Sequence, residues 1–99
     1  MKTEAQVLRE QQQTAQLLSK KAEALLDTGN YEEAIPLFSQ AIELWPTWEM
    51  HFARGAVQQF DANNPLEACK DYEIAYKSKN EMSAIGLNNL ERNMQMANC

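Results

Sequence analysis

The chain has 99 residues, a length that fits one domain with a single modest core, and no apolar run approaches the roughly 18 residues that cross a membrane. Its formal net charge of −5 argues against nucleic acid as a partner, because phosphate backbones are bound by clustered lysine and arginine side chains. Polar glutamines follow the first residues in place of the apolar stretch of a signal peptide, so we expect a cytoplasmic protein without nucleic-acid or membrane partners.

The first predicted element is a helix that begins near Thr3 and runs to about Thr28. Threonine is a common N-cap, and Gly29 can adopt the left-handed backbone conformation that closes a helix. The apolar residues of this segment recur at helical spacing and therefore share one face: Leu8, Ala15, Leu18, Ala22 and Leu25.

The second predicted helix follows directly and ends before Pro46. Asn30 is positioned to cap it, and Glu33 is placed to reach back in a capping box. Pro36 lies close to the start of this helix, where the loss of one backbone hydrogen bond costs least. The apolar stripe of the helix consists of Ala34, Ile35, Phe38, Ala41, Ile42 and Leu44.

Two further helices are predicted in the second half of the chain. Thr47 is a suitable cap for a helix over residues 48–60. Asn64 and Pro65 then open a helix that ends near Ser78, because proline is favoured at the first helical position.

A last helix is predicted over residues 81–96. Its apolar positions are Met82, Ile85, Leu90 and Met94. No segment of the chain shows the alternation of a strand, so the sequence predicts an all-α protein.

The sequence repeats itself at a spacing of 34 residues. Ala34 corresponds to Ala68 at this spacing, and Phe38 corresponds to Tyr72. The remaining equivalences are Glu33 with Glu67 and Ala41 with Ala75. A fixed period in this range is typical of repeat proteins, in which each helical pair buries one face only by stacking on its neighbour.

These residues carry a resemblance to a known family. Gly-Asn-Tyr-Glu-Glu-Ala over residues 29–34, followed by Phe38, Ala41 and Pro46, resembles the second half of a tetratricopeptide repeat. Arg54-Gly55, followed by alanines and tyrosine at the repeated positions, is similar to a second copy. In such a repeat, alanines mark the close approach of two helices and the aromatic side chain fills the space between them.

The resemblance covers about residues 15–80 and implies an all-α fold of tetratricopeptide-like helical hairpins, with about five antiparallel helices. We expect a single domain over residues 1–99. Its expected segments are a helical extension over 1–14, a first repeat over 15–48, a second repeat over 49–80 and a capping helix over 81–97.

The sequence leaves the register of the third helix open between two alignments. One alignment pairs Gly55 with Ala22 and turns Phe52 toward the concave surface of the stack. The other pairs Ala56 with the same alanine. It places Phe52 in the core and Val57 at the groove. We favour the first alignment, which requires one extra residue in the loop before the fourth helix.

The resemblance implies a protein-binding function, because tetratricopeptide repeats receive a peptide or a partner helix in a concave groove lined by the first helix of each pair. Carried over by position, the groove residues of this chain are Gln16, Ser19, Glu23, Asp27, Glu49, Phe52, Ala56, Gln59 and Phe60. This set is acidic with aromatic patches, so we expect a ligand that supplies a lysine or arginine and an apolar anchor. The alternative is that the acids only form a solvated helix face.

Two other functions remain open at this point. The chain is a structural or self-assembling subunit if its long N-terminal helix, which extends beyond the repeat, packs against a second copy. Residues 20–44 also resemble the first hairpin of a microtubule-interacting-and-trafficking module, but the second repeat argues against that family.

No residue pattern predicts catalysis, a cofactor or a metal site. His51 is the one histidine and has no ligand partner at suitable spacing, so we expect ordinary packing or exposure. The carboxylates of Glu32, Glu33, Asp71 and Glu73 are expected to be exposed, and neither pair implies acid–base chemistry. The protein is therefore not expected to be an enzyme.

The two cysteines occupy different settings. Cys69 falls within a helical pattern, where a thiol acts as a small apolar residue, and Cys99 is the last residue. Their separation and lack of paired spacing favour two reduced thiols, with Cys99 able to link two chains under oxidation.

Overall fold

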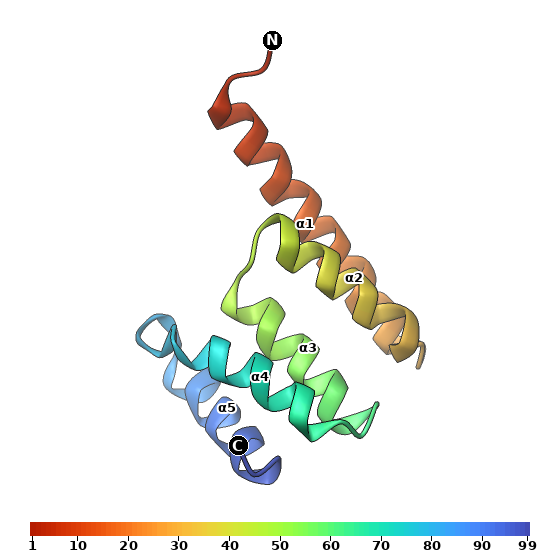
Figure 1. The fold of residues 1–99 in the computed structure, drawn as a ribbon, viewed down its shortest axis with the longest axis vertical. Helices are drawn as coiled ribbons and strands as arrows, with labels where there is room; N and C mark the ends of the chain where they lie inside the picture. Colours follow the sequence, from red (N-terminus) through yellow and green to blue (C-terminus); the bar gives the residue numbers. More distant parts are fainter. The chain divides into compact units, whose positions relative to one another are not determined.

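The computed structural model describes all 99 residues and contains five α-helices and no strand (Figure 1). The helices are α1 (Glu4–Asp27), α2 (Tyr31–Leu44), α3 (Trp48–Phe60), α4 (Pro65–Tyr76) and α5 (Ala84–Met96), with a short 3-10 turn η1 (Lys79–Glu81) before α5. The chain divides into two compact units, Met1–Pro46 and Thr47–Cys99. The prediction of an all-α fold built from helical hairpins is confirmed.

The first unit is the hairpin of α1 and α2. A capping box starts α1, because the Thr3 hydroxyl accepts from the Gln6 amide at 3.2 Å while the Gln6 side chain accepts from the Thr3 amide at 2.9 Å. Gly29 closes the helix with a φ of +81°. The buried residues of the hairpin are Ala15, Ala22, Ala34, Phe38 and Ala41. The small alanines let the two helices approach closely.

The predicted capping box at the start of α2 is wrong. The Asn30 side chain makes no cap hydrogen bond. Its Nδ2 instead donates to the Thr28 hydroxyl at 2.9 Å. The Asn30 backbone has φ −92° and ψ 59°, and its side chain is engaged by the Thr28 hydroxyl, so it does not serve the following amides.

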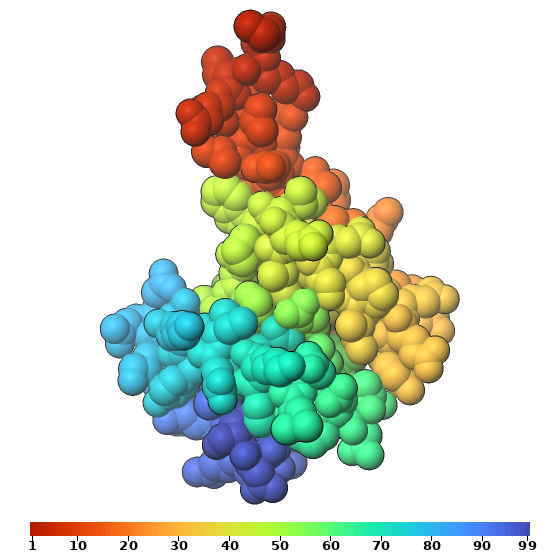
Figure 2. All heavy atoms as spheres, in the orientation of Figure 1, coloured from red at the N-terminus to blue at the C-terminus, as the bar shows by residue number.

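The N-terminal part of α1 extends beyond α2. At a rise of about 1.5 Å per residue, the 24 residues of α1 span about 36 Å, whereas the 14 residues of α2 span about 21 Å. Residues 1–10 are all exposed. Figure 2 shows this end of α1, in red, standing clear of the rest of the first unit.

The second unit is the α3–α4 hairpin with α5 packed against it. Thr47 caps α3 by accepting from the Met50 amide at 3.2 Å, and Asn64 accepts from the Glu67 amide at 3.4 Å at the start of α4. The core of this unit contains Ala68, Tyr72, Ala75, Leu90 and Ala97. Side chains that are half-buried against that core are Trp48, Phe52, Cys69, Tyr76, Met82 and Met94.

The last helix differs from its prediction at the N-terminal end. It begins at Ala84, where the Ser83 hydroxyl accepts from the Gly86 amide at 3.0 Å, and the preceding residues form η1. Ile85 was expected on the apolar face but is 74 % exposed. Only Leu90 of the α5 residues is fully enclosed.

At Gly55 α3 approaches α4 closely. A β-carbon added there would lie 2.7 Å from Cε1 of Tyr72 and 3.3 Å from the carbonyl oxygen of Ala68. Val57 is also buried, at 3 % exposure. Both observations favour the alignment that pairs Gly55 with Ala22. Phe52, which that alignment turns toward the concave surface, is instead half-buried and packs against the core, as the other alignment expects.

Gly55→Ala should lower the free energy of unfolding by about 1–3 kcal/mol, because the added methyl group meets a tyrosine ring that has no room to move. Urea unfolding followed by circular dichroism measures the change. Gly86→Ala is the matched control, since its β-carbon meets only the Ser83 hydroxyl at 3.3 Å and the edge of Trp48 at 3.9 Å. Equal effects of the two substitutions would contradict the close approach at Gly55.

The structure contradicts the expectation of two reduced thiols. Cys69 and Cys99 form a disulfide, with their Cα atoms 5.4 Å apart. The end of α5 makes this possible: Asn98 adopts a φ of +61°, and the Cys99 amide donates to the Met94 carbonyl at 2.9 Å. These contacts turn the last residue back toward α4, an arrangement that sequence spacing alone does not reveal.

Candidate functional site

The first unit carries an acidic face on α1. Gln16, Ser19, Glu23 and Asp27 follow one another at steps of 3, 4 and 4 residues, which places them on one side of the helix. Ser19 is half-buried and the other three are exposed. The alanines that pack in the hairpin lie on a different side. This face therefore presents two carboxylates and an amide to solvent.

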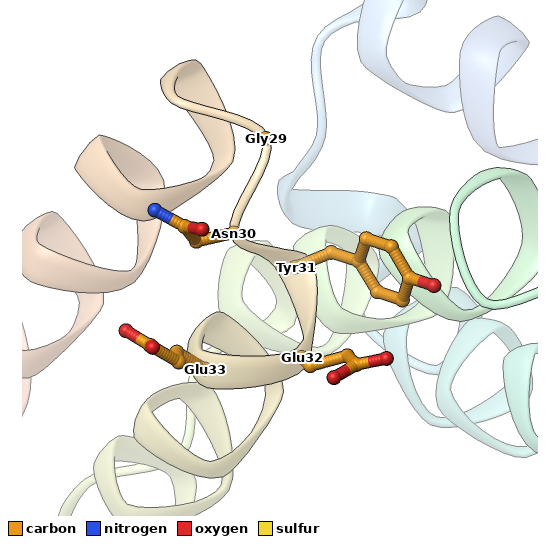
Figure 3. Close-up of a pocket in the computed structure, with 5 residues that line it drawn as sticks. All are labelled: Gly29, Asn30, Tyr31, Glu32 and Glu33. Atoms are coloured by element: carbon orange, nitrogen blue, oxygen red, sulfur yellow. The ribbon is translucent and has the colours of Figure 1, made fainter.

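A shallow hollow lies at the turn that joins α1 to α2. It has a volume of about 270 Å³ and is lined by Gly29, Asn30, Tyr31, Glu32 and Glu33. Figure 3 shows the side chains of Tyr31 and Glu32 on one side of the turn and those of Asn30 and Glu33 on the other. Both glutamates are exposed, as expected. The turn adds two carboxylates to the acidic end of the first unit, with no nucleophile or histidine among the lining residues.

In the second unit, the five predicted groove residues on α3 have unequal environments. Glu49 is exposed, Phe60 is 54 % exposed, and Phe52, Ala56 and Gln59 are half-buried. The predicted set is thus divided between the two units, four residues on α1 and five on α3.

Two of these α3 residues already have partners within the second unit. The ring of Phe52 lies 6.0 Å from that of Tyr72, centroid to centroid. The Tyr72 hydroxyl donates to Gln59 Oε1 at 2.6 Å, and Gln59 Nε2 donates to the Asn93 carbonyl at 3.2 Å. Gln59 therefore ties α4 and α5 to α3, which leaves Glu49 and Phe60 as the most accessible members of the set.

Burial raises the pKa of Tyr72 to about 12, with Asp71 adding a smaller upward effect. The phenol is consequently neutral at pH 7 and remains a hydrogen-bond donor. Its hydrogen bond to Gln59 fits this state. Tyr72 is a structural residue of the core, and it offers no ionised oxygen for chemistry.

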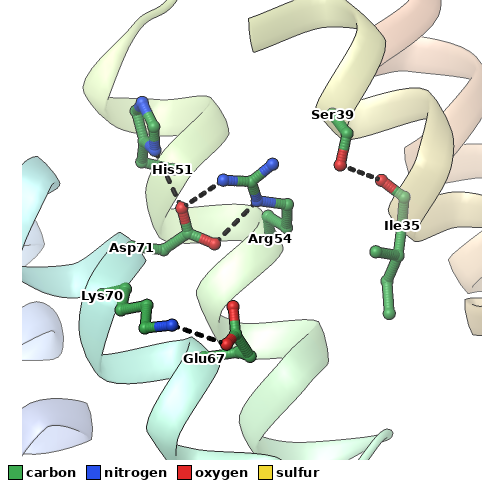
Figure 4. A network of polar contacts seen from close by, with 7 residues as sticks. All are labelled: Ile35, Ser39, His51, Arg54, Glu67, Lys70 and Asp71. Atoms are coloured by element: carbon green, nitrogen blue, oxygen red, sulfur yellow. Dashed lines mark hydrogen bonds and ion pairs between the residues drawn. The ribbon is translucent and has the colours of Figure 1, made fainter.

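A buried polar network joins α3 to α4 (Figure 4). His51 Nδ1 lies 2.9 Å from Asp71 Oδ1, and Arg54 donates to both oxygens of the same carboxylate, each at 2.7 Å. An ionised carboxylate only accepts, so the His51 Nδ1 carries the hydrogen. Hydrogen bonds to Asp71 raise the pKa of Arg54.

The expectation that Asp71 is exposed is wrong, because its exposure is only 2 %. The sequence does contain a signal for this burial: Leu37 occupies the position of Asp71 one repeat earlier, and Leu37 is half-buried. A carboxylate at an apolar position needs a partner, which Arg54 and His51 supply. Glu73 is exposed as expected.

The network holds helices together and is not arranged for catalysis. Both oxygens of Asp71 accept from the guanidinium, and His51 is 7 % exposed, so a substrate could not reach the pair. No buried side-chain nitrogen or oxygen lacks a hydrogen-bond partner, and no group of three or more His, Cys, Asp or Glu side chains is placed to hold a metal ion. None of the helices has the length and apolar character of a membrane span.

Comparison with known proteins identifies one family. A model of the tetratricopeptide repeat matches residues 15–48, whereas no curated protein and no solved structure shows a significant match to the chain. This repeat is generally a non-catalytic unit of protein–protein interaction. The matched segment holds all of α2 and the part of α1 that packs against it, joined by the Gly29 turn. Residues 15–48, about a third of the 99-residue chain, therefore match the tetratricopeptide-repeat family.

Proposed function

We propose that this protein is a non-catalytic cytoplasmic adaptor that binds a basic peptide or helix through the exposed face of α1. The observation that carries the proposal is the alignment of Gln16, Ser19, Glu23 and Asp27 on one side of α1 within the matched repeat. Their side chains reach solvent without serving the hairpin core. A row of this kind is suited to a ligand that lies along the helix.

The chemistry of the face selects the ligand. Two carboxylates four residues apart on a helix repel each other, and a lysine or arginine from a partner relieves that repulsion. Both carboxylates belong to a chain of net charge −5, which attracts a basic partner and disfavours an acidic one. A cationic peptide or helix is thus the favoured class.

The second unit presents the remaining residues of the predicted set on its own helix α3. Phe60 is 54 % exposed at the end of α3, and Glu49 is exposed at its start. Ala56 lies between them on the helix, and the half-buried Phe52 and Gln59 border it. Phe60 offers an apolar contact at one end of α3 and Glu49 a carboxylate about three turns away at the other, which fits a partner with an apolar anchor and a basic residue spaced along the helix.

The double substitution Glu23→Lys with Asp27→Lys should weaken peptide binding at least about tenfold, because two attractive charge contacts become repulsive. The probe is a set of peptides selected from a random displayed library on the wild-type protein, with affinities measured by fluorescence anisotropy. We expect the selected peptides to be rich in lysine, arginine and apolar residues.

The matched control is Glu73→Lys with Glu91→Lys, which changes the net charge equally at two exposed positions of the second unit. This control should bind the selected peptides within about threefold of wild type. Both double variants should retain the wild-type circular dichroism and melting temperature. Unchanged binding by the α1 variant, or selected peptides without basic residues, would refute the proposed face.

A further inference from the structure

The overhanging end of α1 is an exposed helix without a packing partner. Its first ten residues are exposed, and they include Val7 at 41 % and Leu8 at 43 %. A helical segment of this length is marginal in water unless another surface supports it. A capping box nevertheless fixes the start of this helix at Glu4. The segment is therefore an exposed helical surface that a partner can cover.

The part of α1 that follows carries the complementary chemistry. A hollow of about 430 Å³ is lined by Thr14, Leu17, Leu18, Lys20, Lys21 and Ala24. Leu17 is 63 % exposed, and both lysines are exposed. Within the overhang Glu4 precedes the apolar Val7 and Leu8, while Lys2 and Glu10 pair with each other at 2.7 Å; in the hollow, apolar side chains precede the two lysines.

The two parts belong to one stripe along the helix. Positions spaced alternately by three and four residues share a face, as in a coiled coil. The stripe that runs from the overhang into the hollow contains Glu4, Val7, Gln11, Thr14, Leu18 and Lys21. From either end, the stripe begins with a charged residue, continues with an apolar residue and then reaches a polar one. The charge is negative at the Glu4 end and positive at the Lys21 end.

We propose that α1 pairs with α1 of a second copy in an antiparallel arrangement, with a twofold axis between Gln12 and Gln13. In this register Glu4 faces Lys21 of the other copy, and Val7 faces the outer edge of its Leu18, which is half-buried at the border of the hairpin core. Gln11 meets Thr14 at the centre. Each contact occurs twice, because the two copies are equivalent in a twofold pair.

Charge favours this arrangement over a parallel one. A parallel pair would place Glu4 against Glu4 and Lys21 against Lys21, whereas the antiparallel pair makes two contacts of opposite charge. The polar layer of Gln11 and Thr14 disfavours registers that would bury these side chains against leucine. The overlap of 18 residues spans about 27 Å and contains only two apolar layers, so we expect a dissociation constant on the order of 10 μM or weaker.

Sedimentation equilibrium of the full chain between about 1 and 500 μM tests the pairing. The wild-type protein should dimerise reversibly, and either Glu4→Lys or Lys21→Glu alone should weaken the dimer about tenfold, because both charge contacts become repulsive. An equimolar mixture of the two single variants should associate again, since the lysines of one variant then face the glutamates of the other at both contacts. The double variant Glu4→Lys/Lys21→Glu should also recover dimerisation.

Glu23→Lys is the control, because its position two residues after Lys21 lies on the other side of α1. It should leave association unchanged, so failure of the pairing and failure of the proposed peptide-binding face are distinguished. A non-reducing gel excludes a disulfide between chains. A wild-type chain that stays monomeric at about 500 μM, or single reversals that neither weaken the dimer nor complement each other, would overturn the pairing.

Discussion

Asp71→Ala should lower the free energy of unfolding by about 3–5 kcal/mol, a loss large enough to unfold much of the second unit. The substitution removes the carboxylate that accepts from Arg54 and His51, which are then left without their buried partner. The Asp71 side chain is almost wholly enclosed, so water cannot replace it at low cost. Urea unfolding followed by circular dichroism at pH 7 measures the loss.

Two control variants distinguish the loss of the polar network from changes in helix propensity and in core packing. Glu73→Ala, on the exposed side of α4, should change the free energy of unfolding by less than about 0.5 kcal/mol. The triple variant His51→Leu/Arg54→Met/Asp71→Leu should recover most of the stability, because it removes all three polar partners together. A loss below about 1 kcal/mol for Asp71→Ala would show that the network does not hold α3 to α4.

Most helix boundaries could be predicted because their signals are local. Thr3, Thr47 and Asn64 each precede a helix, and each accepts a hydrogen bond from the amide three residues later in the structure. The same reasoning failed at Asn30, whose backbone angles are set by the Gly29 turn. Asn64 caps its helix from the non-extended angles φ −125° and ψ 78°, so residue type predicts a cap only where no neighbouring group takes up the side chain, as Thr28 does at Asn30.

Features that depend on distant residues were not predictable in the same way. Asp71 finds Arg54 and His51 at separations of 17 and 20 residues, and Gln59 reaches the Asn93 carbonyl 34 residues later. Only tertiary packing brings these groups together. The acidic face of α1, in contrast, follows from spacing within a single helix, and its role in binding stays a prediction.

Cys99→Ser in the oxidised protein should lower the free energy of unfolding by about 3–4 kcal/mol. Cys69 and Cys99 are 30 residues apart, and a crosslink of that span restricts the unfolded chain by about this amount in the chain-entropy model. Denaturation of wild type and variant, each with and without dithiothreitol, measures the effect.

Reductant should remove the difference in the free energy of unfolding between wild type and Cys99→Ser. It opens the crosslink in the wild-type protein, whereas the variant has no disulfide within the chain. α5 retains Leu90 and Ala97 in the core without the crosslink, so its helicity should persist in the reduced protein. A wild-type protein that unfolds at the same urea concentration with and without dithiothreitol would show that the crosslink adds no stability. Under reducing conditions the packing of α5 rests on its apolar contacts, and the Cys69–Cys99 bond adds stability only under oxidation.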